Sequence, residues 1–267
     1  MKKTLILLAS VALIASCNNE DLEMPESKGE IVKINFTATN GTSRTTINNG
    51  TSEWLQGDQI KIFNGKNATN ATDKEVVTAA ASESGANVVF PAEIKKCDTG
   101  EKYYAVYPAS ATTGISNGQI QVTLPVNQKA VANGYDPNAI LAVACTDNNA
   151  FQFKNVTSLL KITVSQACKK LVIAGNTSIA GRLGVSLTND GSGINTVLQD
   201  VNQNTITVKG DINPGNYYLV ALRPGKYEHV VVFAFKDDDD ESDYLMYTTL
   251  FSPTFERNKI KTVNLTK

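Results

Sequence analysis

The chain has 267 residues, of which 25 are basic and 26 acidic, and its formal net charge is −1. This balance provides no basic field for nucleic acid, so no nucleic-acid partner is expected. His229 is the only histidine. A single histidine excludes most acid–base triads and most zinc sites, so we expect no enzyme, no catalytic residue, no metal and no cofactor.

The first 16 residues are typical of an export signal. A basic start, Met1–Lys3, precedes an apolar run over 4–14 that is too short to span a bilayer permanently. Small residues then lead directly to Cys17, which resembles the acylated cysteine of a bacterial lipobox. We predict that residues 1–16 are a lipoprotein signal peptide and that a lipid on Cys17 holds the mature chain on the outer membrane. The alternative is an ordinary secretory signal followed by a chance cysteine.

Residues 17–30 predict a flexible acidic tether. The stretch has five acidic side chains, and Leu22 and Met24 are its only sizeable apolar groups. Such a segment cannot bury enough surface to offset the entropy lost on ordering. The pair Glu20-Asp21 resembles an export signal that sends some lipoproteins of Gram-negative anaerobes to the outer face of the cell. A surface-exposed lipoprotein is therefore expected.

Strand patterns dominate the rest of the chain. Residues 31–39, 59–63 and 119–124 alternate between apolar and polar side chains, and Asn-Gly and Pro-Gly turns separate the strands. The best helix candidate, 77–84, is short. Further strands are predicted at 103–107, 140–144, 159–164, 171–174, 205–208, 217–222, 230–235, 244–250 and 259–265.

Many short strands joined by such turns predict an all-β protein built from β-sandwiches. The segment Tyr103–Pro108 recurs as Tyr217–Pro224, and each is a Tyr-Tyr strand closed by proline. We therefore expect two tandem domains, 31–147 and 148–267, divided near the polar stretch 146–149. Besides Cys17, the chain has Cys97, Cys145 and Cys168, an odd number that leaves at least one free thiol.

Two motifs could carry chemistry. Gly114–Gly118 matches the nucleophile-elbow pattern, but a β-alternation follows it instead of a helix, which favours a simple turn. The acidic run Asp237–Glu241 could attract calcium, but as an EF-hand loop it has Ser242 where glycine is needed and Thr248 in place of the final glutamate. A solvated hairpin turn is favoured there.

An ordered series of segments resembles the fimbrillin family of surface lipoproteins. The segments are Ile34–Ala38, Ser43–Thr45, Trp54–Ile60, Tyr103–Pro108, Leu124-Pro125 with Gln128, and Phe151–Val156. The resemblance covers the first half of the mature chain. It implies two transthyretin-like β-sandwiches and a structural or adhesive subunit of cell-surface fimbriae that assembles with the same or related subunits. Host or bacterial surface receptors and glycans are further candidate partners.

The resemblance also implies proteolytic assembly. A cut between Arg44 and Thr45 would release the tether together with strand 31–39. The slots of Val32, Ile34, Phe36 and Ala38 would then lie open for a strand from another subunit. The alternative for Arg44 is an exposed loop arginine without a processing role.

The candidate donor strand is 259–265, with Val263 and Leu265 filling the slots. The alternative is that this strand completes its own domain. A stalk, a tip and an anchor subunit all stay open.

A competing hypothesis is a monomeric surface lipoprotein that binds glycan. Its support is Trp54 and the tyrosine pairs 103–104 and 217–218, because exposed aromatic faces stack on sugars. Tyrosine alternation is also ordinary strand packing, and Trp54 before Gly57-Asp58 has the pattern of a core residue. Glycan binding predicts a cluster of exposed aromatic rings, whereas the fimbrial hypothesis predicts a removable first strand over an apolar groove.

Overall fold

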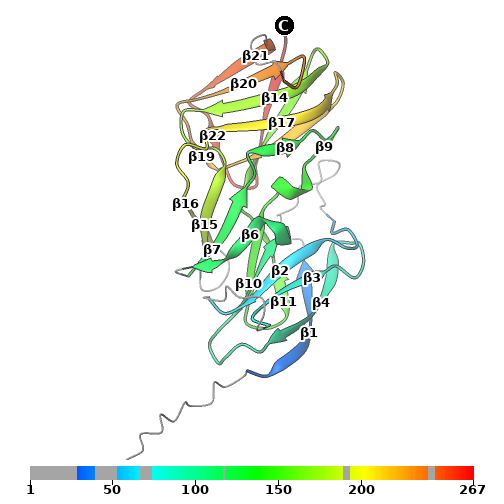
Figure 1. The fold of residues 1–267 in the computed structure, drawn as a ribbon, viewed down its shortest axis with the longest axis vertical. Coiled ribbons are helices and arrows are strands. Elements are labelled where there is room, and N and C mark those ends of the chain that lie inside the picture. Colours follow the sequence, from blue (N-terminus) through cyan, green and yellow to red (C-terminus); the bar gives the residue numbers. More distant parts are fainter. Residues whose placement is uncertain (1–28, 40–52, 67–73, 117, 189–192, 240–243) are drawn as a thin grey trace, which may run out of the picture.

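The computed structural model describes residues 29–39, 53–66, 74–116, 118–188, 193–239 and 244–267 (Figure 1). Within these segments the chain is built from β-strands, with two single-turn 3-10 helices, η1 (Ala109–Ala111) and η2 (Pro137–Ala139), and no α-helix. The prediction of an all-β protein is therefore confirmed. The described residues of the acidic run, Asp237–Asp239, follow the first of two antiparallel strands, 229–235 and 244–251, and residues 240 and 241 fall outside the description.

Two sheets form the lower half of the molecule in Figure 1. A three-stranded sheet has the order β11-β1-β4, and a five-stranded sheet has the order β12-β10-β5-β2-β3. A core rich in aromatic rings fills the space between them. The strands are β1 (Ile31–Thr39), β2 (Gln59–Asn64), β3 (Val76–Ala80), β4 (Asn87–Lys95), β5 (Tyr103–Tyr107), β10 (Ala142–Thr146), β11 (Ala150–Gln152) and β12 (Lys154–Asn155).

The centre of the five-stranded sheet is buried on both faces. All five residues of β5 are buried, with Tyr103, Ala105 and Tyr107 in the aromatic core and Tyr104 and Val106 in a second, larger core. Side chains on successive residues of a strand point to opposite faces, so a strand covered on both sides shows a continuous apolar run. This explains why the sequence of β5 does not alternate.

The remaining strands surround the larger core. Two four-stranded sheets have the orders β16-β15-β7-β6 and β23-β13-β18-β9, a five-stranded sheet has the order β21-β20-β14-β17-β8, and β19 pairs with β22. Their bounds are β6 (Thr112–Ser116), β7 (Gln119–Leu124), β8 (Asn127–Lys129), β9 (Gly134–Tyr135), β13 (Ser158–Val164), β14 (Cys168–Gly175), β15 (Gly181–Leu187), β16 (Ile194–Leu198), β17 (Thr205–Ile212), β18 (Tyr217–Leu222), β19 (Gly225–Lys226), β20 (His229–Phe235), β21 (Tyr244–Phe251), β22 (Thr254–Phe255) and β23 (Ile260–Leu265).

The chain crosses between the two halves more than once. Strands β7, β8 and β9 precede residue 147 yet pair with β15, β17 and β18, which follow it. Strand β10 then returns to the lower half and pairs with β5. The division of the chain after residue 147 and the transthyretin-like topology stay predictions.

The residue pattern does not predict several of the strands, and β4 illustrates the reason. Pro91 in its middle argues against a strand, since proline cannot donate to a ladder. In the structure Pro91 lies opposite Asn35 of β1. The backbone of Asn35 and Thr37 bonds in the other direction, to Asn149, so Pro91 and Asn35 form a non-hydrogen-bonded pair and the missing N–H of Pro91 breaks no bond between β4 and β1. The helix candidate 77–84 was also wrong, because β3 occupies 76–80.

Candidate strand-exchange site around the first strand

Strand β1 is the middle strand of its sheet. It pairs antiparallel with β4 over nine residues, from Ile31 opposite Lys95 to Thr39 opposite Asn87. On its other side it pairs parallel with β11 over Thr37–Thr39. Removal of β1 would therefore leave an empty strand position between β4 and β11, with a sheet edge on each side. We call this position the β1 lane.

The four predicted slot residues of β1 do face the interior. Phe36 and Ala38 are fully buried, and Val32 and Ile34 are half-buried, whereas the residues between them are exposed. This alternation places one face of β1 in the aromatic core and the other in water. The depth of burial increases along the strand toward Thr39.

Aromatic rings form the floor of the β1 lane. The Phe36 ring stacks on Phe151 with a centroid separation of 5.0 Å and meets Tyr103 edge-on at 5.0 Å. Phe153 continues the cluster at 5.9 Å from Phe151. Loss of β1 would expose these rings, and an exposed aromatic floor favours capture of another apolar strand.

A turn between 54 and 58 closes one end of this core. Trp54 is buried and meets the rings of Phe90, Tyr107 and Phe153 edge-on at 5.1–5.2 Å. Gly57 has a φ of +87°, a conformation that favours glycine. The Asp58 carboxylate accepts hydrogen bonds from the Leu55 N–H at 2.8 Å and from the Tyr107 hydroxyl at 3.2 Å. The Trp54–Asp58 segment is thus a structural plug.

The N-terminal half of β1 borders an open groove of about 800 Å³. Val32, Ile34, Cys97 and Tyr103 line its apolar side, and Asp147–Asn149 line the opposite side. The groove exists because β11 begins only at Ala150, and β11 therefore pairs with β1 only from Thr37 onward. One side of β1 therefore lacks a strand partner over 31–34 within the described residues.

The structure places the predicted donor residues in the C-terminal half. Strand β23 pairs parallel with β13 over six residues, from Ile260 opposite Leu159 to Leu265 opposite Val164. Val263 and Leu265 are buried in the larger core. The strand completes its own sheet here, so a donor role would require it to leave β13. Cys17, Arg44 and Thr45 lie outside the described residues.

The aromatic residues named for glycan binding are not available to a sugar. Trp54 is 1% exposed, Tyr103, Tyr104 and Tyr218 are buried, and Tyr217 is half-buried under the ammonium of Lys161, which lies 4.3 Å from the ring centroid. Their ring faces contact other side chains. The exposed aromatic side chains lie elsewhere, on β21.

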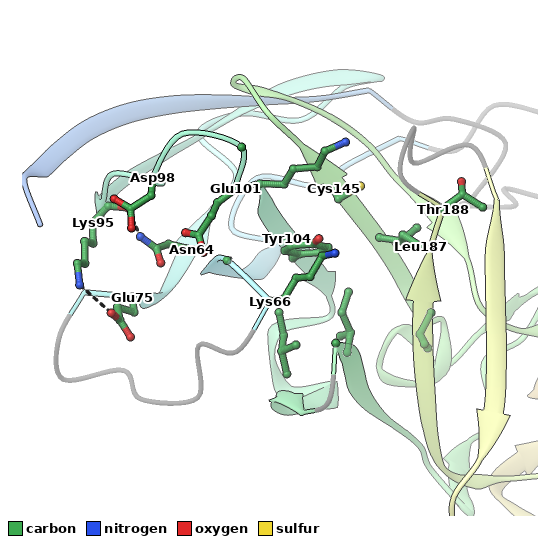
Figure 2. Close-up of a pocket in the computed structure, with 17 residues that line it drawn as sticks. Asn64, Lys66, Glu75, Lys95, Asp98, Glu101, Tyr104, Cys145, Leu187 and Thr188 are labelled. Carbon is green, nitrogen blue, oxygen red and sulfur yellow. Dashed lines mark hydrogen bonds and ion pairs between the residues drawn. The ribbon is translucent and has the colours of Figure 1, made fainter.

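A second cavity, of about 770 Å³, lies between the β2–β5 edge and the β7–β15 strands (Figure 2). Its lining mixes three basic side chains with three acidic ones, and Lys95 and Glu75 form an ion pair at 2.9 Å. Tyr104 lies in the middle of the lining, and burial raises its pKa to about 12. Mixed charges give no field of one sign for a charged ligand. The lining residues are Asn64, Gly65, Lys66, Glu75, Lys95, Asp98, Gly100, Glu101, Lys102, Tyr104, Ile115, Gly118, Ile120, Cys145, Val185, Leu187 and Thr188.

The reactive side chains are dispersed. His229 is the exposed first residue of β20, and Ser116 of the nucleophile-elbow match ends β6, which pairs antiparallel with β7. Cys97, Cys145 and Cys168 form no disulfide with one another. Burial raises the pKa of both Cys97 and Cys168 to about 11, which keeps them protonated. Among the described residues no three His, Cys, Asp or Glu side chains are grouped to hold a metal.

Comparisons with known proteins give likenesses at low identity. A scan against protein-family models gives no match, and a search of curated proteins gives none. A search of solved structures gives matches, and these include two candidate cell adhesion proteins and one fimbrial protein. A candidate cell adhesion protein of Bacteroides ovatus has a TM-score of 0.47 and 12% identity, over 89% of this chain and 95% of that chain. A candidate cell adhesion protein of Parabacteroides distasonis has a TM-score of 0.43 and 8% identity, over 88% and 89%.

The third structure is a fimbrial protein of Bacteroides ovatus, with a TM-score of 0.36 and 13% identity over 89% of this chain. The match covers 48% of that protein, so this chain spans about half of its length. These likenesses do not establish what this chain does. In the described segments, none of the helices has the length and hydropathy of a membrane span.

Proposed function

We propose that this protein is a structural or adhesive subunit of cell-surface fimbriae, exported as an outer-membrane lipoprotein and assembled by β-strand exchange after proteolysis. The position of β1 carries the proposal. It is the first strand of the fold, it separates β4 from β11, and it buries Phe36 and Ala38 in the aromatic core. A cut after β1 would therefore free the strand whose loss exposes the edges of both β4 and β11.

The lane is selective for a strand of matching pattern. An incoming strand must pair with β4 over nine residues and place apolar side chains at alternate positions over Phe151 and Tyr103. Charged side chains at those positions would be buried without partners, which is costly. The lane therefore favours an apolar alternating strand, and another copy or a related subunit is the expected source.

The cleavage step rests on Arg44, five residues beyond the end of β1. A cut there separates β1 from the rest of the chain without removing any residue of β2 to β23. The cut alone does not release β1, because its nine pairings with β4 and the burial of Phe36 persist. Exchange needs a competing strand that replaces these contacts.

The test uses the chain with Cys17 replaced by serine, treated with an Arg-specific protease and run unboiled on a denaturing gel. The expected result is a ladder of multimers with a new N-terminus at Thr45. The variant Arg44→Lys keeps the charge but not the cleavage site, and should give no ladder. A cut chain that runs as a single monomer band would refute polymerisation by exchange between copies.

A peptide experiment then tests the lane itself. A synthetic peptide with the sequence of 31–39 should bind the cut chain and stop the ladder. The matched control is the same peptide with Phe36→Lys, which places a charge over the Phe151 ring and should not compete. Equal competition by both peptides would show that polymerisation does not use the β1 lane.

A further inference from the structure

Strand β21 is an open edge of the C-terminal half (Figure 1). It is the terminal strand of the sheet β21-β20-β14-β17-β8, and within the described residues only β20 pairs with it. Its eight residues, Tyr244–Phe251, include no charged side chain and no proline. A groove of about 590 Å³ follows the strand and ends at Thr266 and Lys267.

This edge lacks the features that keep sheet edges from pairing. Charged side chains, proline and short length are the usual protections. The other long terminal strand, β4, has nine residues but carries Pro91, Glu93 and Lys95. On β21, by contrast, Tyr244 is 47% exposed, Tyr247 54% and Phe251 82%. Large apolar groups thus line a strand that has no charged side chain of its own, which is typical of a pairing surface.

The backbone groups available on this edge can be identified. The Ser252 N–H donates to the Glu228 carbonyl at 2.7 Å, so even-numbered residues at this end of the ladder bond toward β20. Because the direction alternates along an antiparallel strand, Tyr247, Thr249 and Phe251 turn their N–H and C=O groups to the open edge. Their side chains lie on the outer face of the sheet, beside the half-buried Val231 and Phe233.

The three outward residues are arranged symmetrically about Thr249. In an antiparallel pair of two β21 strands centred on Thr249, each outward residue meets another outward residue. Tyr247 lies opposite Phe251 of the second strand, and Thr249 lies opposite its own copy. Aromatic pairs and Thr–Thr pairs are both favourable across strands. The same register uses all three outward backbone positions of each strand.

We propose that two copies of this chain associate through antiparallel pairing of their β21 strands about Thr249. The two five-stranded sheets then form one continuous sheet, and the most exposed aromatic side chains, Tyr247 and Phe251, cover each other. Strands without charge meet without electrostatic repulsion, so a second copy fits this edge. The association is independent of Arg44 cleavage and goes beyond the proposed assembly at β1.

A charge-swap experiment tests this pairing on the uncut chain with Cys17 replaced, without protease. Sedimentation velocity over a concentration series should show a monomer–dimer equilibrium. Thr249→Lys and Thr249→Glu each place like charges opposite one another at the two-fold axis and should each weaken dimerisation on the order of 100-fold. An equimolar mixture of the two variants should dimerise again, because the opposed charges are then opposite in sign.

The matched control is Thr205→Lys. One cross-strand row on the same face runs through Thr205, Ala174, Val231 and Thr249. Thr205 lies on β17, three strands away from β21. This variant should dimerise like the unsubstituted chain. The proposal would be overturned if the unsubstituted chain is a monomer at all concentrations or if the dimer survives Thr249→Lys. It would also be overturned if the mixture stays monomeric although each variant has an unchanged circular dichroism spectrum.

Discussion

Replacing Phe36 by alanine should strongly destabilise the half of the protein that contains β1. Loss of a fully buried phenylalanine costs about 3–5 kcal/mol of folding free energy. The Phe36 ring also makes two aromatic contacts, with Phe151 and Tyr103, both at 5.0 Å. Such pairs contribute about 0.5–1.5 kcal/mol beyond burial, so the upper half of the range, about 4–5 kcal/mol, is expected.

Urea unfolding followed by tryptophan fluorescence measures this loss. Trp54 is the only tryptophan and lies in the same core as Phe36, so its emission reports on the unfolding of that core. With a slope of about 2 kcal/mol per M, the midpoint for Phe36→Ala should fall by about 2 M. Phe36→Leu retains part of the buried volume and should lose about 1–2 kcal/mol.

The control is Val201→Ala, which truncates an apolar side chain that is 73% exposed and lies outside the proposed β21 contact. Its free energy of unfolding should change by less than about 0.5 kcal/mol. A loss below about 1.5 kcal/mol for Phe36→Ala would refute the claim that β1 is an integral strand of the core. If the claim holds, Phe36→Ala should also speed the formation of the protease-dependent ladder, because the strand to be displaced is held less tightly.

Two further predictions concern buried groups. The Gln128 side chain donates to the Ala221 carbonyl at 2.7 Å and accepts from the Ala221 N–H at 3.0 Å. Gln128→Ala should therefore lower the free energy of unfolding, measured in urea, by about 2–4 kcal/mol, whereas Asn127→Ala at the exposed neighbour should be nearly neutral. Equal effects of the two substitutions would contradict this role of Gln128. Burial raises the pKa of the Cys97 and Cys168 thiols to about 11, so each is about 0.1% thiolate at pH 8. Each thiol should therefore react with a disulfide reagent at least roughly 100-fold more slowly in the folded than in the unfolded chain. The reaction of the folded chain should become faster as the pH rises toward 11. Each thiol is followed with the other cysteines replaced by serine, and rapid labelling of the folded chain would contradict its burial.

Much of the strand pattern could be predicted locally. The alternation of 31–39 places Phe36 and Ala38 inward, and the structure confirms this. Tyr103–Tyr107 and Tyr217–Leu222 are both strands, as their shared pattern indicates. Strand β4 was missed because Pro91 is a local signal against a strand, and only its non-hydrogen-bonded pairing with Asn35 removes the cost.

The candidate site was predicted only in part. The sequence indicates that 31–39 is a strand with one apolar face, but not that it lies between β4 and β11. It likewise suggests glycan contacts at Trp54, which the fold buries among three aromatic rings. The exposed aromatic edge of β21 has no distinctive sequence signal, because its residues resemble those of any half-buried strand.

The sequence by itself determined the all-β class, the position of many strands and the inward face of β1, since these depend on side chains two residues apart. The tertiary structure alone decided which strands are neighbours. Strands β7, β8 and β9 pair with residues 57 to 84 positions further along the chain, β1 pairs with β11, and β21 is left at an edge. Such pairings depend on how whole sheets bury their faces against one another, and no local pattern of residues specifies them.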